Sequence, residues 1–250
     1  MNALTITVKP LATNQGVWQN GNFLYFYVGW SQPSQEEMVY GVVRFHKDNR
    51  NSEVYKKMVS EAINSEQRSL LIVGGALFTY EAKDKQGNSK SFVGINLNPF
   101  HGSSMLLVDS GLSDNTNQLY WAGWVSEVKA FESYDGSKKP FVYINAPCKM
   151  FDTEEKKDVT TWLRIKSWDA YDVKVFKDAQ KGSRAWAHGR MSVQYYTPNE
   201  GPNAGQERMN AEVLVSQAGL FQSRGGGGGS YQENALPNDD EVRNMANIPF

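Results

Sequence analysis

Aromatic and basic residues alternate with aliphatic ones in the stretch "TTWLRIKSWDAY". The residues on one parity are Trp162, Arg164, Lys166 and Trp168. Leu163 and Ile165 lie between them on the other parity. A half-buried strand directs successive side chains to opposite faces. The stretch therefore predicts a strand with an aliphatic core face and an opposite face of tryptophans and cations.

Two further stretches show the same alternation. In Arg184–Val193 the aromatic or basic parity consists of Arg184, Trp186, His188 and Arg190. In Phe141–Ala146 it consists of Phe141 and Tyr143. If the three predicted strands are adjacent in one sheet, their aromatic and basic side chains join into one surface. An exposed aromatic surface of that size requires a partner.

Aromatic rings interleaved with cations suit single-stranded nucleic acid. Unpaired bases stack on aromatic side chains, at about 1–3 kcal/mol per base, and the cations meet phosphates. Because every base has a π-face, such binding tolerates any sequence. The alternation alone leaves a second interpretation open, in which the aromatic residues fill a second core under the stems of Arg and Lys side chains. The four cations weigh against it, because a buried charge needs a partner.

The first half of the chain has a weaker version of this pattern. Its candidate DNA-binding residues are Tyr25, Tyr40, Arg44, Phe78 and Tyr80. The strands that contain them have fewer cations and no tryptophan. Two interpretations stay open, because this half could bind DNA less tightly or its aromatic residues could be structural.

The elements that must position these residues are mostly short strands between turn signals rich in Gly, Asn and Asp. The predicted strands are 23–28, 39–46, 70–80 and 91–97 in the first half, and 121–128, 141–146, 161–168, 183–196 and 208–216 in the second. Helical patterns occupy Asn51–Glu66 and Ala170–Gly182. The similar order in the two halves indicates a divergent internal repeat.

A five-stranded barrel with a helix between its third and fourth strands is the OB-fold plan. We therefore predict an all-β fold with short helices, made of two OB-fold barrels in tandem and a disordered Gly-rich tail. The expected units are an N-terminal OB domain at 1–112, a C-terminal OB domain at 119–222, and a flexible linker with an acidic and apolar tip at 223–250.

Composition limits the class of protein. The chain has 250 residues, of which 21% are charged, and a formal net charge of -1, which argues against a uniformly basic nucleic-acid binder. The single cysteine, Cys148, excludes an internal disulfide framework and a cysteine-cluster metal site. No signal peptide is visible, and no apolar run approaches the roughly 20 residues that span a bilayer. We expect a soluble, cytoplasmic protein without membrane contact.

Patterns typical of catalysis are missing from the sequence. The three histidines, His46, His101 and His188, lack a metal-binding spacing. Neither a nucleophile elbow nor a phosphate-binding loop occurs. We therefore predict no enzymatic activity, no cofactor and no bound metal.

The second half of the chain resembles the bacterial single-stranded DNA-binding protein family. The resemblance lies in "WLRIKSW", a following helix, and then "KGSRAWAHGRMSVQYYT". It implies base stacking on Trp162, Trp168 and Tyr196. The end "IPF" after a Gly-rich linker and acidic residues is similar to the family's partner-binding tip. Two OB domains in one chain imply a homodimer with four OB-folds. The acidic residues stand apart from the apolar end here, which is a departure from the family pattern.

We thus expect sequence-independent binding and protection of single-stranded DNA in replication, recombination and repair. The expected DNA-binding residues are Trp162, Trp168, Trp186, Tyr196, Phe141, Tyr143, Arg164, Lys166, Lys174, Lys177, Arg184 and Arg190. The expected tip for replication and repair proteins is Asp239, Asp240, Glu241, Ile248, Pro249 and Phe250. The alternative is an adaptor or structural OB-fold subunit of a replication or mobile-element complex that does not itself bind DNA.

Overall fold

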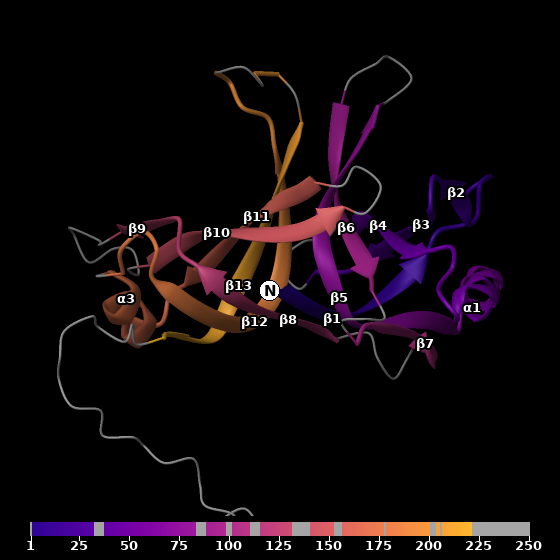
Figure 1. Ribbon diagram of the computed structural model, residues 1–250, viewed down its shortest axis with the longest axis horizontal. Helices are drawn as coiled ribbons and strands as arrows, with labels where there is room; N and C mark the ends of the chain where they lie inside the picture. Colours follow the sequence, from indigo (N-terminus) through magenta and orange to yellow (C-terminus); the bar gives the residue numbers. More distant parts are fainter. Residues whose placement is uncertain are drawn as a thin grey trace, which may run out of the picture.

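The structure is a computed structural model that describes residues 2–32, 38–83, 89–98, 102–110, 116–131, 141–152, 157–177, 179–200, 204–205 and 207–221. Within these ranges the chain forms strands and two short helices (Figure 1). The all-β expectation is therefore confirmed. No helix in the described part of the chain combines the length and the apolar character needed to cross a membrane.

The first half contains seven strands and helix α1. The elements are β1 (Asn2–Pro10), β2 (Trp18–Asn20), β3 (Phe23–Trp30), β4 (Val39–His46), α1 (Ser52–Asn64), β5 (Arg68–Lys83), β6 (Ser89–Leu97) and β7 (Ser104–Asp109). Strands β1, β3, β4, β6 and β5 pair in that order, and β5 returns to β1. Strands β4 and β6 run parallel and the other pairs antiparallel. These five strands, called the first barrel below, therefore form a closed OB-type circuit with α1 between the third and fourth strands.

The second half repeats this circuit. Its elements are β8 (Asn117–Trp124), β9 (Glu127–Phe131), β10 (Phe141–Asp152), β11 (Lys157–Ser167), α3 (Ala170–Lys177), β12 (Arg184–Tyr196) and β13 (Arg208–Leu220). Strands β9, β10, β11, β13, β12 and β8 pair in that order, with β11 and β13 parallel. Only two residues separate β8 from β9, so together they act as the first strand of what we call the second barrel. The OB-fold expectation is confirmed.

The opening strand of the first barrel was not among the predicted strands. Asn2–Pro10 alternates regularly, because Leu4, Ile6 and Val8 are all buried. Its other edge pairs antiparallel with β8, from Asn2 opposite Trp121 to Ile6 opposite Asn117. The first strands of the two barrels thus join them into one 13-stranded sheet.

Two side-chain amides extend the contact between the barrels along β12, beyond the residues of β12 that pair with β8. Asn117 donates to the backbone oxygen of Met191 (2.8 Å) and accepts from its N–H (3.0 Å). The buried Gln32 of the first barrel makes the same paired contact with Val193, at 3.3 and 3.0 Å. Each amide mimics a peptide group, so the free edge of β12 is satisfied where no strand pairs with it. The two barrels are therefore held in a defined orientation.

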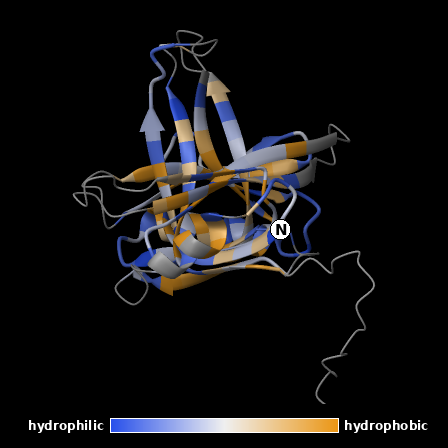
Figure 2. Cartoon of the chain, turned by 90° about the vertical axis from the view of Figure 1, so that its left-hand side faces the viewer, coloured by the Kyte–Doolittle hydropathy of each residue, from blue (hydrophilic) through white to orange (hydrophobic). Residues whose placement is uncertain are grey.

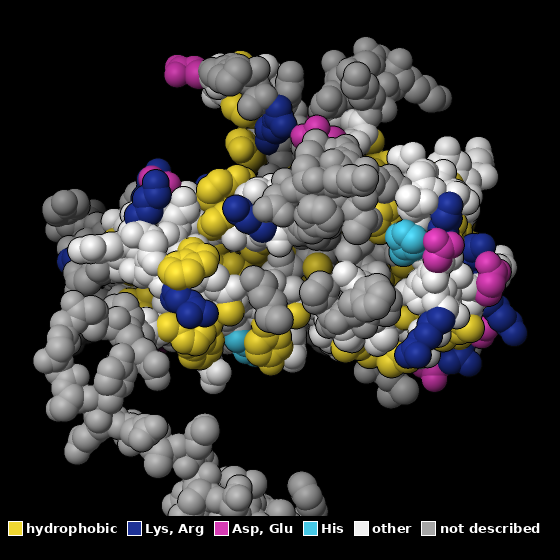
Figure 3. Space-filling view, viewed as in Figure 1, with side chains coloured by type: hydrophobic (Ala, Val, Ile, Leu, Met, Phe, Trp, Pro, Cys, Tyr) yellow, Lys and Arg dark blue, Asp and Glu magenta, His cyan; other side chains and the backbone are white. Residues whose placement is uncertain are grey.

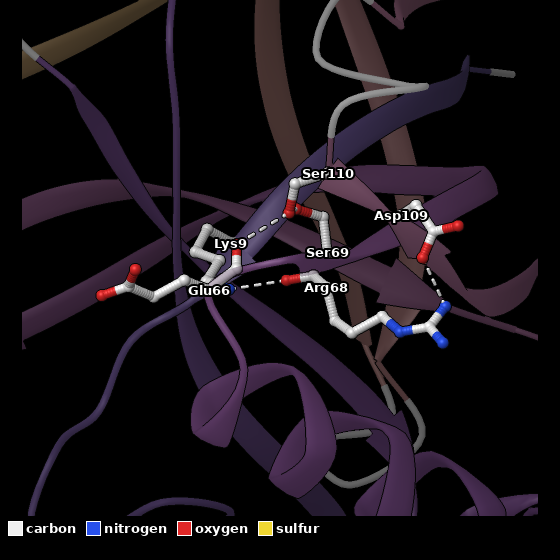
Figure 4. Close-up of polar contacts among 6 residues, drawn as sticks. All are labelled: Lys9, Glu66, Arg68, Ser69, Asp109 and Ser110. Atoms are coloured by element: carbon white, nitrogen blue, oxygen red, sulfur yellow. Dashed lines mark hydrogen bonds and ion pairs between the residues drawn. The ribbon is translucent and has the colours of Figure 1, made fainter.

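Polar contacts fasten β1, β5 and the end of β7 to one another beside helix α1 (Figure 4). The Lys9 ammonium donates to the backbone oxygen of Arg68 at 2.6 Å, and the Arg68 guanidinium pairs with Asp109 at 2.6 Å. The hydroxyls of Ser69 and Ser110 are 2.9 Å apart. These contacts connect β1, β5 and the end of β7, next to the C-terminus of the helix.

Two long hairpins, β5–β6 and β12–β13, project from the barrels (Figures 1 and 2). Hydrophilic and hydrophobic residues alternate along the projecting strands in Figure 2. Charged residues connect the hairpins, because Lys90 lies 3.3 Å from Glu207 and Arg208 lies 3.8 Å from Glu81. The hairpins therefore stand side by side above the junction.

Candidate nucleic-acid interface

Strand β11 has the two faces that its alternation predicts. Leu163 and Ile165 are buried in the core, whereas Trp162 and Trp168, the residue that follows the strand, are 56% and 44% exposed. The two cations between the tryptophans are half-buried. Strand β10 pairs with β11 and places Tyr143 directly opposite Lys166. The structure thus brings the aromatic and basic residues of β10 and β11 together on one outer face.

Cations lie against the aromatic rings on this face. The Lys166 ammonium is 5.3 Å from the ring centre of Phe141 and 4.7 Å from that of Trp168. The Arg164 guanidinium is 4.8 Å from the ring centre of Tyr143. Such contacts contribute about 0.5–1 kcal/mol each at exposed sites. They hold the rings and charges in place, so the face is organised before any ligand binds.

Arg164 has a second partner that sequence reasoning missed. Its Nη1 atom donates to Oε1 of Glu212 at 3.2 Å, and Glu212 is 1% exposed. The parallel pairing of β11 with β13 sets Arg164 opposite Glu212. The available signal was a carboxylate within the otherwise apolar run "AEVLV". A buried carboxylate on the neighbouring strand therefore lies beside Arg164, on the same side of the sheet.

The outer face of the second barrel continues around β13 onto β12 and β8. Arg184 lies between the rings of Trp124 and Phe221, 5.4 Å from each centre. Tyr120 stacks on His188 with ring centres 4.1 Å apart. Trp124, Tyr120 and Phe221 were missed, although "QLYWAGW" alternates in the same way. In Figure 3 hydrophobic and basic side chains gather over this half of the molecule.

A bulge and a glycine shape this part of the face. Strand β12 has an irregular register between His188 and Gly189. A Cβ atom on Gly189 would lie 2.1 Å from the carbonyl oxygen of Leu214, so only glycine fits there. Gly219 lies opposite Trp186, and a Cβ there would come 2.8 Å from the indole nitrogen. Trp186 is therefore packed down on β13, half-buried, unlike the exposed tryptophans of β11 and β8.

The other predicted residues of this barrel are spread more widely. Tyr196 is 45% exposed near the end of β12. Arg190 is exposed and lines a cavity of about 320 Å³ at the junction of the barrels. Lys177 is exposed on α3, and the side chain of Lys174 lies outside the described residues. The aromatic and basic residues of β10 and β11 thus lie close together, whereas Tyr196, Arg190 and Lys177 lie outside this group.

The first barrel uses the equivalent face differently. Tyr25, Arg44 and Phe78 are only 6%, 6% and 5% exposed. The Arg44 guanidinium is sandwiched between Phe23 and Phe78, 4.2 Å from each ring centre. Its Nε atom donates to Oδ1 of Asn96 at 3.0 Å. Their own neighbours cover these three side chains, which favours the structural interpretation of the two that the sequence leaves open.

Two first-barrel candidates remain nearer the surface. Tyr80 is half-buried against Tyr25, with ring centres 6.0 Å apart, and burial raises the pKa of its hydroxyl, with a further rise from Tyr27. Tyr40 is 48% exposed, and its backbone oxygen accepts a hydrogen bond from the Tyr195 hydroxyl at 3.1 Å. Only the tyrosines at the rim of the first barrel therefore reach solvent among these candidates.

Metal-binding and reactive groups are sparse in the described residues, where no three His, Cys, Asp or Glu side chains gather as metal ligands. Cys148 is buried, and burial raises the pKa of its thiol. A buried thiol with a raised pKa is a poor nucleophile. His101 lies outside the described residues. The tip residues Asp239, Asp240, Glu241, Ile248, Pro249 and Phe250 also lie outside them.

Comparison with known proteins adds evidence on the fold. No protein-family model matches the sequence. No curated protein matches it either. The structure of the single-stranded DNA-binding protein from Thermus aquaticus superposes with a TM-score of 0.55, covering 92% of this chain and 97% of that chain at 13% identity. This chain shares the fold of a single-stranded DNA-binding protein.

The structure of a deletion mutant of the Thermus aquaticus protein matches this chain to the same degree. Its TM-score is 0.55 at 13% identity, covering 89% of this chain and 95% of that chain. The match extends over both barrels, so the resemblance seen in the sequence is confirmed for the fold. At 13% identity the comparison shows the fold and assigns no role to individual residues of this chain.

Proposed function

We propose that this chain binds single-stranded DNA without sequence preference and without catalysis. The observation that carries the proposal is the outer face of β10 and β11, where exposed Trp162 and Trp168 flank cations held against aromatic rings. A soluble domain does not ordinarily leave such a surface without a partner. Bases stack on the rings, and phosphates meet the neighbouring cations.

The residues divide by role according to their exposure. Trp162, Trp168 and Tyr196 are exposed and stack bases, while Phe141, Tyr143 and the half-buried Trp186 support them. The cations that meet phosphates are Lys166, Arg184, Arg190, Lys177 and Lys174. Stacking on a ring uses the π-face that every base has, so no base is preferred. Coating of this kind protects single strands in replication, recombination and repair.

Titration of tryptophan fluorescence with oligo-dT tests the proposal. The chain has seven tryptophans, and stacking of bases on Trp162 and Trp168 quenches the exposed ones strongly. Affinity falls as salt rises, because phosphate contacts release counterions. An unchanged signal, with no binding in a second assay at low salt, would exclude DNA as the ligand. A flat salt dependence would contradict the cation assignments.

The assembly and the tail belong to the same proposal. The chain is divided into OB domains at 1–112 and 119–222 and a linker with its tip at 223–250. Two chains form a homodimer with four OB-folds. The tip recruits replication and repair proteins, which receive Ile248, Pro249 and Phe250 in a basic-rimmed apolar pocket. The closed circuit in each half supports the division, and the apolar character of these three residues supports the tip.

A further inference from the structure

The pair between Arg164 and Glu212 differs from the other ion pairs of the described residues in its burial. Glu212 is 1% exposed, whereas the acidic partners in the other ion pairs of the described residues are 45% exposed or more. Its Oε1 atom lies 3.2 Å from Arg164, and its Oε2 atom has no hydrogen-bond partner among the described residues. A buried carboxylate loses much of its hydration, and removing its counter-charge is strongly destabilising.

This burial constrains what Arg164 can do at the interface. If the guanidinium moved outward to meet a phosphate, the Glu212 charge would be left in the protein without its cation. Arg164 also lies 4.8 Å from the ring centre of Tyr143, and its side chain is 34% exposed. It therefore stays in place as a planar group beside the tyrosine ring, with its charge compensated by Glu212 on the adjacent strand.

The first barrel contains the corresponding arginine in a different setting. Arg44 on β4 lies opposite Asn96 on β6, just as Arg164 on β11 lies opposite Glu212 on β13. Arg44 hydrogen bonds to the neutral Asn96 and is covered by two rings. Of these two arginines, only the one on the open face has a carboxylate opposite it, which associates the carboxylate with the interface rather than with the barrel fold.

We propose that Glu212 is a positioning residue of the DNA interface. It holds Arg164 beside Tyr143 and cancels its charge, so that Arg164 acts as a stacking platform and releases no counterion when DNA binds. This rests on the proposed function. The cations that set the salt dependence are then the uncompensated ones, such as Lys166.

The test is the salt dependence of oligo-dT binding by the full chain. Each phosphate contact to a single strand adds about 0.7 to the slope of log affinity against log salt. Glu212→Gln keeps the shape and removes the compensating charge, so the slope becomes steeper by roughly 0.7, or roughly a further 2.6-fold loss of affinity between 50 and 200 mM salt. The control is Glu53→Gln, the same charge change at an 81% exposed residue of α1, which leaves the slope unchanged.

The double variant Arg164→Gln with Glu212→Gln distinguishes charge compensation by Glu212 from simple structural support. It also takes the place of Glu212→Gln if the single variant does not fold. It removes a charge pair of zero net charge, so its slope equals that of the wild type while its affinity is lower. An unchanged slope in folded Glu212→Gln, or a slope shallower by about 0.7 in the double variant, overturns the inference. Wild-type protein that does not bind oligo-dT overturns the proposed function, and this inference with it.

Discussion

Arg44 is a residue for which the sequence leaves DNA binding and structural packing both open and the structure favours packing, so its replacement is an informative single change. Arg44→Met keeps an unbranched apolar stem and removes the guanidinium from between Phe23 and Phe78. The structure predicts a loss of stability and no loss of DNA affinity, because the side chain is 6% exposed. If Arg44 instead contacted a phosphate, the substitution would lower DNA affinity and leave stability unchanged.

The expected loss follows from the contacts. Two desolvated cation–π contacts contribute roughly 1–2 kcal/mol each, and the charged hydrogen bond from Nε to Asn96 contributes about 1.5–3 kcal/mol. Burying the methionine in place of a charge offsets part of this. We expect the free energy of unfolding to fall by about 2–4 kcal/mol, near the upper range of single substitutions.

Urea unfolding measures the change in stability from the transition midpoint at constant slope, and oligo-dT titration measures affinity on the same preparation. The control is Arg50→Met, the same substitution at an exposed arginine of the same barrel, which should change stability by less than about 0.5 kcal/mol. A tenfold loss of DNA affinity in Arg44→Met, with an unchanged urea midpoint, would refute the structural role.

Three further predictions follow from other parts of the molecule. Trp162→Ala should weaken oligo-dT binding by about 1–3 kcal/mol, whereas Val54→Ala, which truncates an exposed side chain of α1, should leave it unchanged; equal affinities in titrations of the two variants would remove Trp162 from the site. Burial raises the pKa of the Tyr195 hydroxyl to about 12 from 10.0, so the folded state keeps a proton that the unfolded state loses. Its stabilising effect is therefore lost as pH rises from 10 to 12, and Tyr195→Phe should flatten that decline in thermal unfolding; an unaltered decline would contradict the assignment. Deleting Ile248–Phe250 should abolish pull-down of replication and repair proteins and leave DNA affinity similar or higher; partners retained by the shortened chain would argue against the tip.

Local alternation was sufficient to predict most strands of the second barrel and the two faces of β11. On β11 the period of two separates Leu163 and Ile165 from Trp162 and Trp168, because a strand directs adjacent side chains to opposite sides whatever its neighbours are. The order of strands and helices in each half was enough to predict the OB plan. The same signal existed in Asn2–Pro10 and in "QLYWAGW", and a count of every alternating run would have found β1 and the exposed Trp124.

Tertiary structure alone decided which of the two similar faces is open. Arg44 and Arg164 both lie on the polar parity of the third strand of a barrel, so the local pattern does not distinguish them. The environment of each guanidinium depends on a residue 52 or 48 positions away, Asn96 or Glu212, which parallel strand pairing brings next to it. Phe78, from yet another strand, covers the first arginine and not the second. Burial and charge compensation are properties of strand register and barrel closure, and no local period encodes either one.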